Sequence, residues 1–192
     1  TWTGMSNVEG TTVYDSFESY SPWLISNVGD WTLYDEDKAG TYGFGGISYP
    51  HMKDAASFIV FNPWQVSGLS SDILDQFAAV FDPHNGKQFM LASAATIDTG
   101  TPTSDWLISP ELSGEEQTVS FWVKAPNDQV TNNATYPNAG PETFDVYYSE
   151  DDNNASSFIK INKESLEATC YWTKHEINLP EGALYFAIVY TT

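Results

Sequence analysis

The sequence predicts an all-β protein, an antiparallel jelly-roll β-sandwich with at most one short helix. Three observations support this prediction: many short segments rich in β-branched and aromatic residues, turn-forming residues between them, and a scarcity of helical periodicity. In the clearest segment, residues 118–124, Val119, Phe121 and Val123 share one face and polar residues the other, with Trp122 as the exception. Such alternation is typical of a strand that has one face in a core.

The expected strands follow one another along the chain, with turns between them. They span residues 13–18, 31–34, 57–61, 78–81, 89–92, 106–109, 118–124, 144–149, 158–161, 171–179 and 184–190. Residues that accept tight backbone geometry, mainly Pro, Asn, Asp and Gly, form turns after several of them. Pro110 ends the strand at 106–109, because proline cannot donate a hydrogen bond to a neighbouring strand.

One segment has a helical pattern. In residues 70–77 a serine can cap a turn in which Ile73, Leu74 and Phe77 share a face. We therefore expect a single helix at most.

The length of 192 residues suits one domain. We expect residues 13–192 to form a single sandwich and residues 1–12 to be a linker or the tail of a preceding module. Two long segments, 37–54 with many Gly and Tyr and 125–141 with many Asn, Thr and Pro, are expected as loops at which a partner can bind.

The charge of the chain excludes several classes of partner. Twenty-six Asp and Glu oppose seven Lys, no Arg occurs, and the net charge is -19. Nucleic acid is excluded because phosphate binding needs a cationic patch, and an anionic membrane surface is disfavoured for the same reason. The apolar runs are only as long as a strand, so no membrane span is expected. Basic protein patches suit this surface better than acidic polysaccharides.

Catalytic and transition-metal patterns are missing from the sequence. Cys170 is the sole cysteine, which rules out an intrachain disulfide and favours a buried thiol. The histidines, His51, His84 and His175, stand in unrelated contexts, and no serine lies in a Gly-x-Ser-x-Gly turn. The histidines and the cysteine also lack the spacing of a zinc site. We therefore predict a protein that binds rather than an enzyme.

Calcium is the cofactor that the acidic residues suit best. Calcium takes several oxygen ligands from carboxylates and backbone carbonyls, and the acidic turns at 35–37 and 150–153 supply both. Neither turn has the spacing of an EF-hand loop. A solvated acidic turn is the alternative interpretation of each.

Exposed aromatic residues are the candidates for ligand contacts. A Trp or Tyr at a loop can stack on a sugar ring or fill a pocket of a protein partner. We select Tyr42 in the first long loop, Trp64 beside Pro63, and Tyr136 in the second long loop. For most aromatic residues of this chain, packing in the core is the alternative.

An ordered set of sequence blocks resembles a known family. The blocks are 15–18 (DSFE), 31–37 (WTLYDED), 105–112 with 120–123 (SFWV), 144–149 (FDVYYS) with 154–158, and the segment 172–190. Together they resemble the cleaved adhesin domain, the hemagglutinin module of gingipain proteases and related surface proteins, and the kindred choice-of-anchor J modules of Bacteroides-type bacteria.

The resemblance implies a jelly-roll sandwich that binds rather than catalyses and that is secreted or displayed on the cell surface, in association with an outer membrane. Its partners would be a host protein or glycan and the neighbouring modules of the same surface protein. The family has a further strand with paired acids after the position of Thr192, so either that strand lies beyond Thr192 or this sandwich closes differently. A structural spacer or assembly module is the alternative function, and a carbohydrate-active enzyme is a third.

The resemblance also implies structural calcium and suggests its ligands. Glu18 is the acid at the end of the first strand that holds the ion in similar sandwiches, and Asp105 stands where the family has Asn or Asp before an aromatic residue. Asp35 and Asp37 belong to the acidic loop. That loop is poorer in Asp and Gly than the family pattern, and Lys38 interrupts it.

Overall fold

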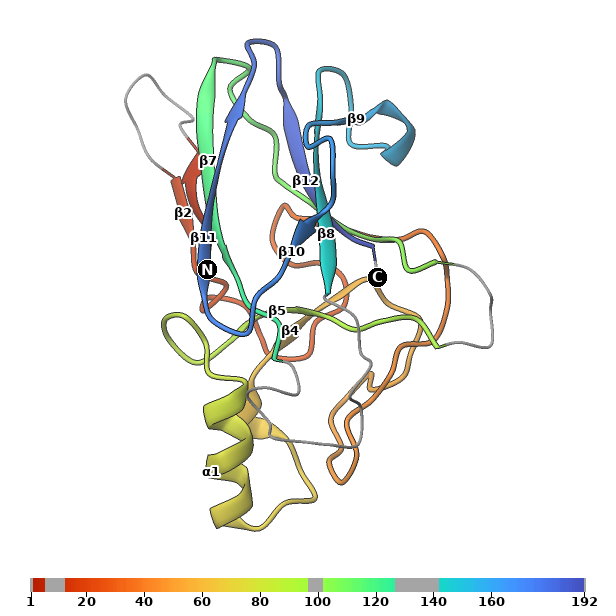
Figure 1. Cartoon of the computed structure of the whole chain (residues 1–192), viewed down its shortest axis with the longest axis vertical. Coiled ribbons are helices and arrows are strands. Elements are labelled where there is room, and N and C mark those ends of the chain that lie inside the picture. Colours follow the sequence, from red (N-terminus) through yellow and green to blue (C-terminus); the bar gives the residue numbers. More distant parts are fainter. Residues whose placement is uncertain (1, 6–12, 97–101, 127–141, 192) are drawn as a thin grey trace.

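The computed structural model describes residues 2–5, 13–96, 102–126 and 142–191. Two antiparallel sheets face each other (Figure 1). One has the strand order β11 (Thr173–Leu179), β7 (Gln117–Val123), β1 (Trp2–Met5) and β2 (Val13–Asp15). The other has the order β10 (Leu166–Glu167), β8 (Thr143–Ser149), β12 (Tyr185–Tyr190), β6 (Asp105–Ile108) and β3 (Thr32–Asp35), and β9 (Ile159–Lys160) pairs with β8.

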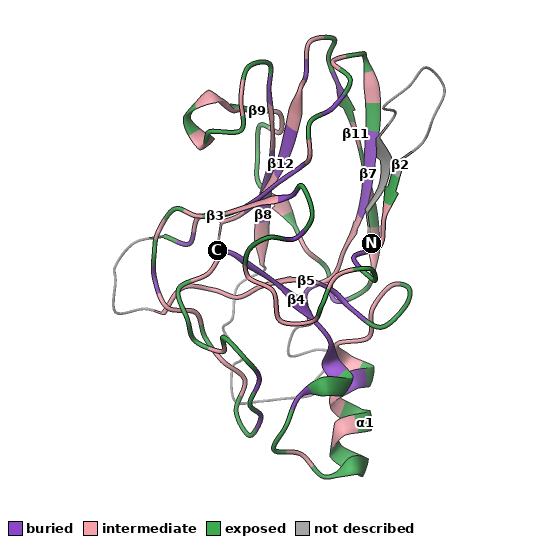
Figure 2. Ribbon diagram, turned by 180° about the vertical axis from the view of Figure 1, so that it is seen from behind, coloured by how far each residue is buried: buried purple, intermediate pink, exposed green. Residues whose placement is uncertain are grey.

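The main core lies between these two sheets. Val119 and Phe121 of β7 meet Val146 of β8 and Phe186 of β12, and each of these side chains is at most 2 % exposed. Figure 2 shows buried residues concentrated on the central strands of both sheets. A smaller apolar cluster on the outer face of the six-stranded sheet lies under the segment that holds η3 (Ala155–Ser157). The predicted all-β sandwich is confirmed, and its jelly-roll connectivity stays a prediction.

A long insert joins β3 to β6 and carries its own core. It contains β4 (Phe58–Phe61), η1 (Pro63–Gln65), α1 (Ser71–Val80) and β5 (Phe89–Ala92), and β4 pairs with β5. Figure 1 shows α1 at the end of the long axis, away from the two large sheets. Aromatic residues from the whole insert pack around Phe61, which is fully buried. None of the described helices is long and apolar enough to cross a membrane.

Strand β4 connects the insert to the sandwich because both of its faces are buried. Phe58 and Val60 point into the main core, whereas Ile59 and Phe61 point into the core of the insert. This alternation follows from the period of two in a strand. Strand β4 therefore belongs to both the main core and the core of the insert.

Three local predictions require correction. Residues 78–81, expected as a strand, form the end of α1 and its C-cap Phe81, and the apolar face of the helix extends from Leu74 through Phe77 to Ala78. Trp2–Met5, expected in a linker, form β1, because they fill the space between the ladders of β7 and β2. The two-residue strand β10 was not expected at all.

The first long loop is folded rather than open. Isolated bridges join Gly40 to Ala55, Thr41 to Ala95 and Ser48 to Ser67. Its apolar residues, such as Ile47, are buried against the core of the insert. Most of the second long loop, 125–141, lies outside the described residues.

Asp15 organises the start of the sandwich. Its Oδ1 accepts a hydrogen bond from the backbone N–H of Phe17 at 2.7 Å. Its Oδ2 accepts from the hydroxyl of Tyr20 at 2.8 Å and from Nε1 of Trp31 at 2.9 Å. Burial, together with the Asp15 carboxylate, raises the pKa of Tyr20. One carboxylate thus fixes two aromatic residues that pack on the main core.

The position of Trp122, the exception to the alternation of apolar and polar residues in β7, has a structural reason. Trp122 points away from the main core and lies under the ring of His84, with the ring centroids 4.1 Å apart and the planes at 20°. His84 also packs edge-on against Trp172 of the segment that leads into β11. Lys124 pairs with Asp82 beside these rings. The insert therefore covers Trp122, and His84 is a packing residue.

His175 of β11 is a histidine packed among the aromatic rings of the core. It stands opposite Phe121 in the ladder, and its ring centroid lies 5.6 Å from that of Phe121 and 5.2 Å from that of Phe144. Its Nε2 is buried and has no hydrogen-bond partner. Burial lowers the pKa of this ring, so the folded protein holds His175 in the neutral form.

We expect the substitution His175→Phe to flatten the pH dependence of stability. As the pH falls through about 6.5, the unfolded chain binds a proton at His175 before the folded chain does. The free energy of unfolding then falls by up to about 1.4 kcal/mol per pH unit until the lower pKa of the folded state is reached. Urea denaturation between about pH 7.5 and 5.5 measures this slope. Equal slopes in the wild type and in His175→Phe would contradict the assignment.

Candidate metal centre

Three of the predicted metal ligands meet at the neck of the insert, the place where the chain leaves β3 and returns to β6. Asp35 is the last residue of β3, Asp105 is the first of β6, and the two are register partners in the sheet. Asp37 lies two residues further along the chain. One carboxylate oxygen from each of the three lies within 4.8 Å of the others.

Backbone amides orient two of these carboxylates. Asp35 Oδ1 accepts from the N–H of Lys38 at 2.6 Å, and Asp37 Oδ1 accepts from the N–H of Ala39 at 2.8 Å. Asp37 Oδ2 accepts from the N–H of Ser104 at 2.8 Å, which joins the two ends of the insert. Lys38, with a φ of 55°, closes the turn. The side-chain positions are therefore set by the local backbone.

Asp105 is the buried member of the cluster, with 3 % of its surface exposed. Among the described residues, no group donates a hydrogen bond to its carboxylate. Burial, followed by the charges of Asp37 and Asp35, raises the pKa of Asp105 to about 8. Burial likewise raises the pKa of Asp35. Three carboxylates this close need a proton or a cation between them.

The donor set fits calcium. Calcium takes six to eight oxygen ligands at about 2.3–2.6 Å, and it accepts carboxylates together with carbonyls and water. The cluster offers only oxygen, which favours a hard cation over zinc or copper. Two of the three ligands stand at the ends of paired strands, so the site is anchored in the sheet. Asp35, Asp37 and Asp105 would hold the ion.

Glu36 belongs to the predicted acidic turn but not to the predicted ligands, and it supports the cluster from its other side. Its Oε2 accepts from the hydroxyl of Ser104 at 2.6 Å and from Nε1 of Trp106 at 3.1 Å. It therefore ties the exit of β3 to the entry of β6. The alternation of the acidic loop gives the signal: Asp35 and Asp37 share one side, and Glu36 points to the opposite one.

Glu18 does not join this cluster. Its Oε1 accepts hydrogen bonds from the backbone N–H groups of Lys87 and Gln88, both at 2.9 Å. Gly86 lies so close that a Cβ there would be 2.4 Å from the Glu18 carboxyl carbon. Through Oε1, Glu18 thus fastens the turn before β5 to the sandwich.

The predicted ligand-binding aromatic residues are dispersed. Tyr42 is 44 % exposed in the first long loop, and Trp64 is 43 % exposed in η1. Tyr136 lies outside the described residues. The two described residues stand on different segments of the insert, so they do not by themselves outline a site.

The histidines do not form an activated nucleophile in the described part of the chain. His51 Nδ1 lies 2.9 Å from Asp54 Oδ2, while His84 stacks on Trp122 and His175 stacks on Phe121. No ring is hydrogen-bonded to a hydroxyl or a thiol of the described residues. Nucleophilic catalysis with a histidine as the base needs such a pair.

Solved structures share this architecture. The K2 cleaved adhesin domain of Lys-gingipain is 16 % identical, with a TM-score of 0.56 over 92 % of this chain and 86 % of that domain. The K3 cleaved adhesin domain of Lys-gingipain from Porphyromonas gingivalis W83 is 22 % identical, with a TM-score of 0.51 over 85 % and 81 %. No family model and no curated protein matches the chain. The class of protein that the structure defines is therefore a β-sandwich with the cleaved adhesin fold.

We expect calcium to raise the melting temperature of this protein through the three-carboxylate cluster. An ion at a hundred times its dissociation constant adds about 2.7 kcal/mol to the stability of the folded state. For a chain of this size that corresponds to a shift of about 5–10 °C. Differential scanning fluorimetry in calcium and in chelator measures it. An unchanged melting temperature would contradict a site at this cluster.

The substitution Asp105→Asn is the matched test of the buried charge. In chelator, Asp105 makes the free energy of unfolding of the wild type fall as the pH rises from about 3.8, its unfolded pKa, to about 8, its folded pKa, because only the folded chain keeps the proton in this range. We expect Asp105→Asn to be the more stable protein above about pH 8 and to lose the calcium shift. The exposed Asp30→Asn serves as the control and should keep both properties. A calcium shift retained in Asp105→Asn would place the ion elsewhere.

Proposed function

We propose that this chain is a noncatalytic binding module of adhesin type that acts outside the cell or on its surface, as part of a larger surface protein. The observation that carries the proposal is the fold, which matches domains named as cleaved adhesin domains over most of both chains. A shared fold is support by analogy and does not by itself identify a partner. The partner must come from the chemistry of the surface.

The acidic end of the sandwich supports a protein partner with a basic surface. The turn after β6 and the β11–β12 turn lie side by side, since the Gly182 N–H donates to the carbonyl of Gly114 at 2.7 Å. Glu150 of the turn after β8 adjoins Gly182. These turns carry seven acids: Glu111, Glu115, Glu116, Glu150, Asp151, Asp152 and Glu181. None of them forms an ion pair with a described residue.

The negative charges of these turns affect the pKa of a neighbouring tyrosine. Burial raises the pKa of Tyr185, and the charges of Glu111 and Asp152 raise it further. A dense negative surface accelerates association with a positively charged partner and repels acidic ones. We propose that this end recognises basic patches of an extracellular protein, such as a protein of the host.

We further propose that calcium, bound by Asp35, Asp37 and Asp105, has a structural role. The cluster joins the exit of β3 to the entry of β6 at the neck of the insert. An ion there would hold the two ends of the insert together and would cancel the repulsion among the carboxylates.

The test is binding to immobilised matrix and blood proteins, measured by biolayer interferometry. We expect the binding to weaken as the salt concentration rises. We also expect at least about tenfold weaker binding, a loss of ~1.4 kcal/mol in binding free energy, in a variant that lacks four of the charges. This variant carries Glu111→Gln, Glu115→Gln, Glu116→Gln and Glu181→Gln. A control with the same loss of charge at exposed positions elsewhere, Asp30→Asn, Asp72→Asn, Asp75→Asn and Glu164→Gln, should bind as the wild type does. Equal loss in both variants would overturn the site, and silence against every protein would overturn the function.

A further inference from the structure

We propose that Asn85 is a site of spontaneous deamidation, and that the product loosens the turn by which the insert is fastened to the sandwich. Asn85 is exposed and precedes Gly86, and the two residues form the only Asn-Gly pair of the sequence. The pair lies between α1 and β5. Glycine has no Cβ to hinder its backbone nitrogen, which is the atom that attacks the side-chain amide in this reaction.

The fold requires glycine at position 86. Gly86 has a φ of 74°, a left-handed conformation that other residues rarely adopt, and a Cβ there would lie 2.4 Å from the carboxyl carbon of Glu18. The side chain of Asn85 has a looser role. Its Nδ2 lies 2.9 Å from Nδ1 of His84, and it bonds to no other residue that the structure describes. The unhindered amide that makes Asn85 reactive is therefore a fixed part of the turn.

Both reacting groups are available. Within the described ranges no group accepts a hydrogen bond from the N–H of Gly86, and the exposed side chain of Asn85 reaches water. The Gly86 nitrogen bonds to Cγ of Asn85, the Cγ–Nδ2 bond breaks, and Nδ2 leaves as ammonia with the proton that the Gly86 nitrogen gives up through water. Water then opens the cyclic succinimide at either of its carbonyls. The product is aspartate, or isoaspartate, in which the main chain runs through the side-chain carbon.

Isoaspartate in this turn would disturb the contacts that follow it. It adds a carbon atom to the main chain directly before Lys87 and Gln88, whose N–H groups donate to Glu18 at 2.9 Å. The side chain of Gln88 also donates to the carbonyls of Phe17 and Tyr20, at 2.6 and 2.8 Å. These bonds fasten the insert to the start of the sandwich, so a shift of the turn weakens the junction.

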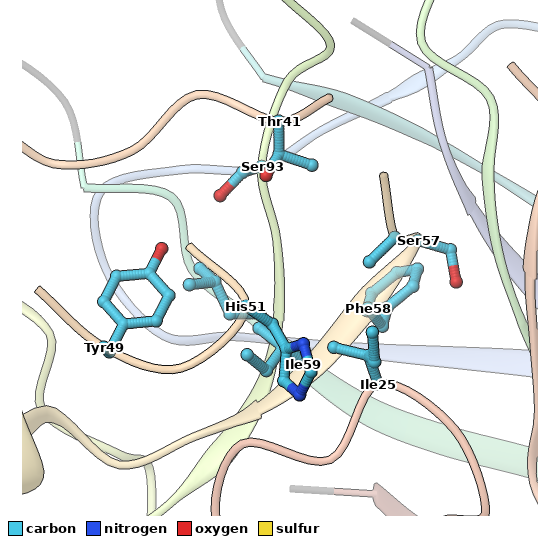
Figure 3. A pocket seen from close by; sticks show the side chains of 10 residues that line it. Ile25, Thr41, Tyr49, His51, Ser57, Phe58, Ile59 and Ser93 are labelled. Atoms are coloured by element: carbon cyan, nitrogen blue, oxygen red, sulfur yellow. The ribbon is translucent and has the colours of Figure 1, made fainter. Parts of the chain in front are cut away.

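The hairpin after the turn has little room to absorb such a shift. Phe89, the first residue of β5, pairs with Phe61 of β4, which is fully buried. The hollow beside the hairpin, between Tyr49 and Phe58 in Figure 3, has room for about one water molecule. Deamidation therefore acts on the junction of the insert and the sandwich rather than on an isolated loop.

The first experiment is ageing of the full chain in mildly alkaline buffer, with peptide mass spectrometry at intervals. Asn27 and Asn153, which are exposed but precede Val and Asn, are internal controls in the same sample. We expect Asn85 to deamidate at least about tenfold faster than either control, with isoaspartate among its products. Conversion of Asn85 no faster than that of the controls would overturn the proposal.

Melting temperatures test the effect on the junction. We expect the converted protein to melt at least about 2–4 °C below the fresh protein, the shift that the loss of one hydrogen bond causes in a chain of this size. Asn85→Gln should keep its melting temperature on ageing, because glutamine forms the corresponding ring far more slowly, and the matched control Asn27→Gln should lose as much as the wild type.

A second variant tests whether the loss passes through Glu18. Fresh Glu18→Gln should melt below the fresh wild type, and ageing should lower its melting temperature by less, because the contact is already weakened. An equal ageing loss in Glu18→Gln and the wild type, or converted wild type that melts as the fresh protein does, would overturn the link to the junction. Neither result bears on the protein binding assigned to the acidic end.

Discussion

Mutual repulsion among three carboxylates constrains the junction on which the rest of this structure depends. The register of β3 and β6 places Asp35 directly opposite Asp105, and the turn that begins the insert brings Asp37 beside them. Burial of Asp105 removes the water that would otherwise weaken the repulsion. The chain leaves the sandwich and returns to it at this point. The geometry of the insert is therefore coupled to whatever neutralises the cluster, a proton or a cation.

Contacts far from the neck hold the insert against the sandwich in the same arrangement. The two faces of β4 belong to different cores, Glu18 fastens the turn before β5, and His84 covers Trp122 on the outer face of β7. Each contact joins residues distant in sequence, so the insert packs as part of one body with the sandwich.

The sequence predicted the elements that depend on local pattern. Alternation located β7, and a run of β-branched and aromatic residues located β12. The acidic turn suggested Asp35 and Asp37 as metal ligands, and the family resemblance suggested Asp105. The sequence could not predict contacts that only tertiary packing creates, such as the one between Glu18 and the amide of Gln88. Residues 78–81 were wrongly expected as a strand, because a short apolar run is compatible with either a strand or one face of a helix.

The most direct test of this account is anomalous diffraction from crystals grown with calcium above about pH 8, where Asp105 is ionised. We predict a peak at about 2.3–2.6 Å from one carboxylate oxygen of each of Asp35, Asp37 and Asp105. A map at saturating calcium with no peak there would contradict it.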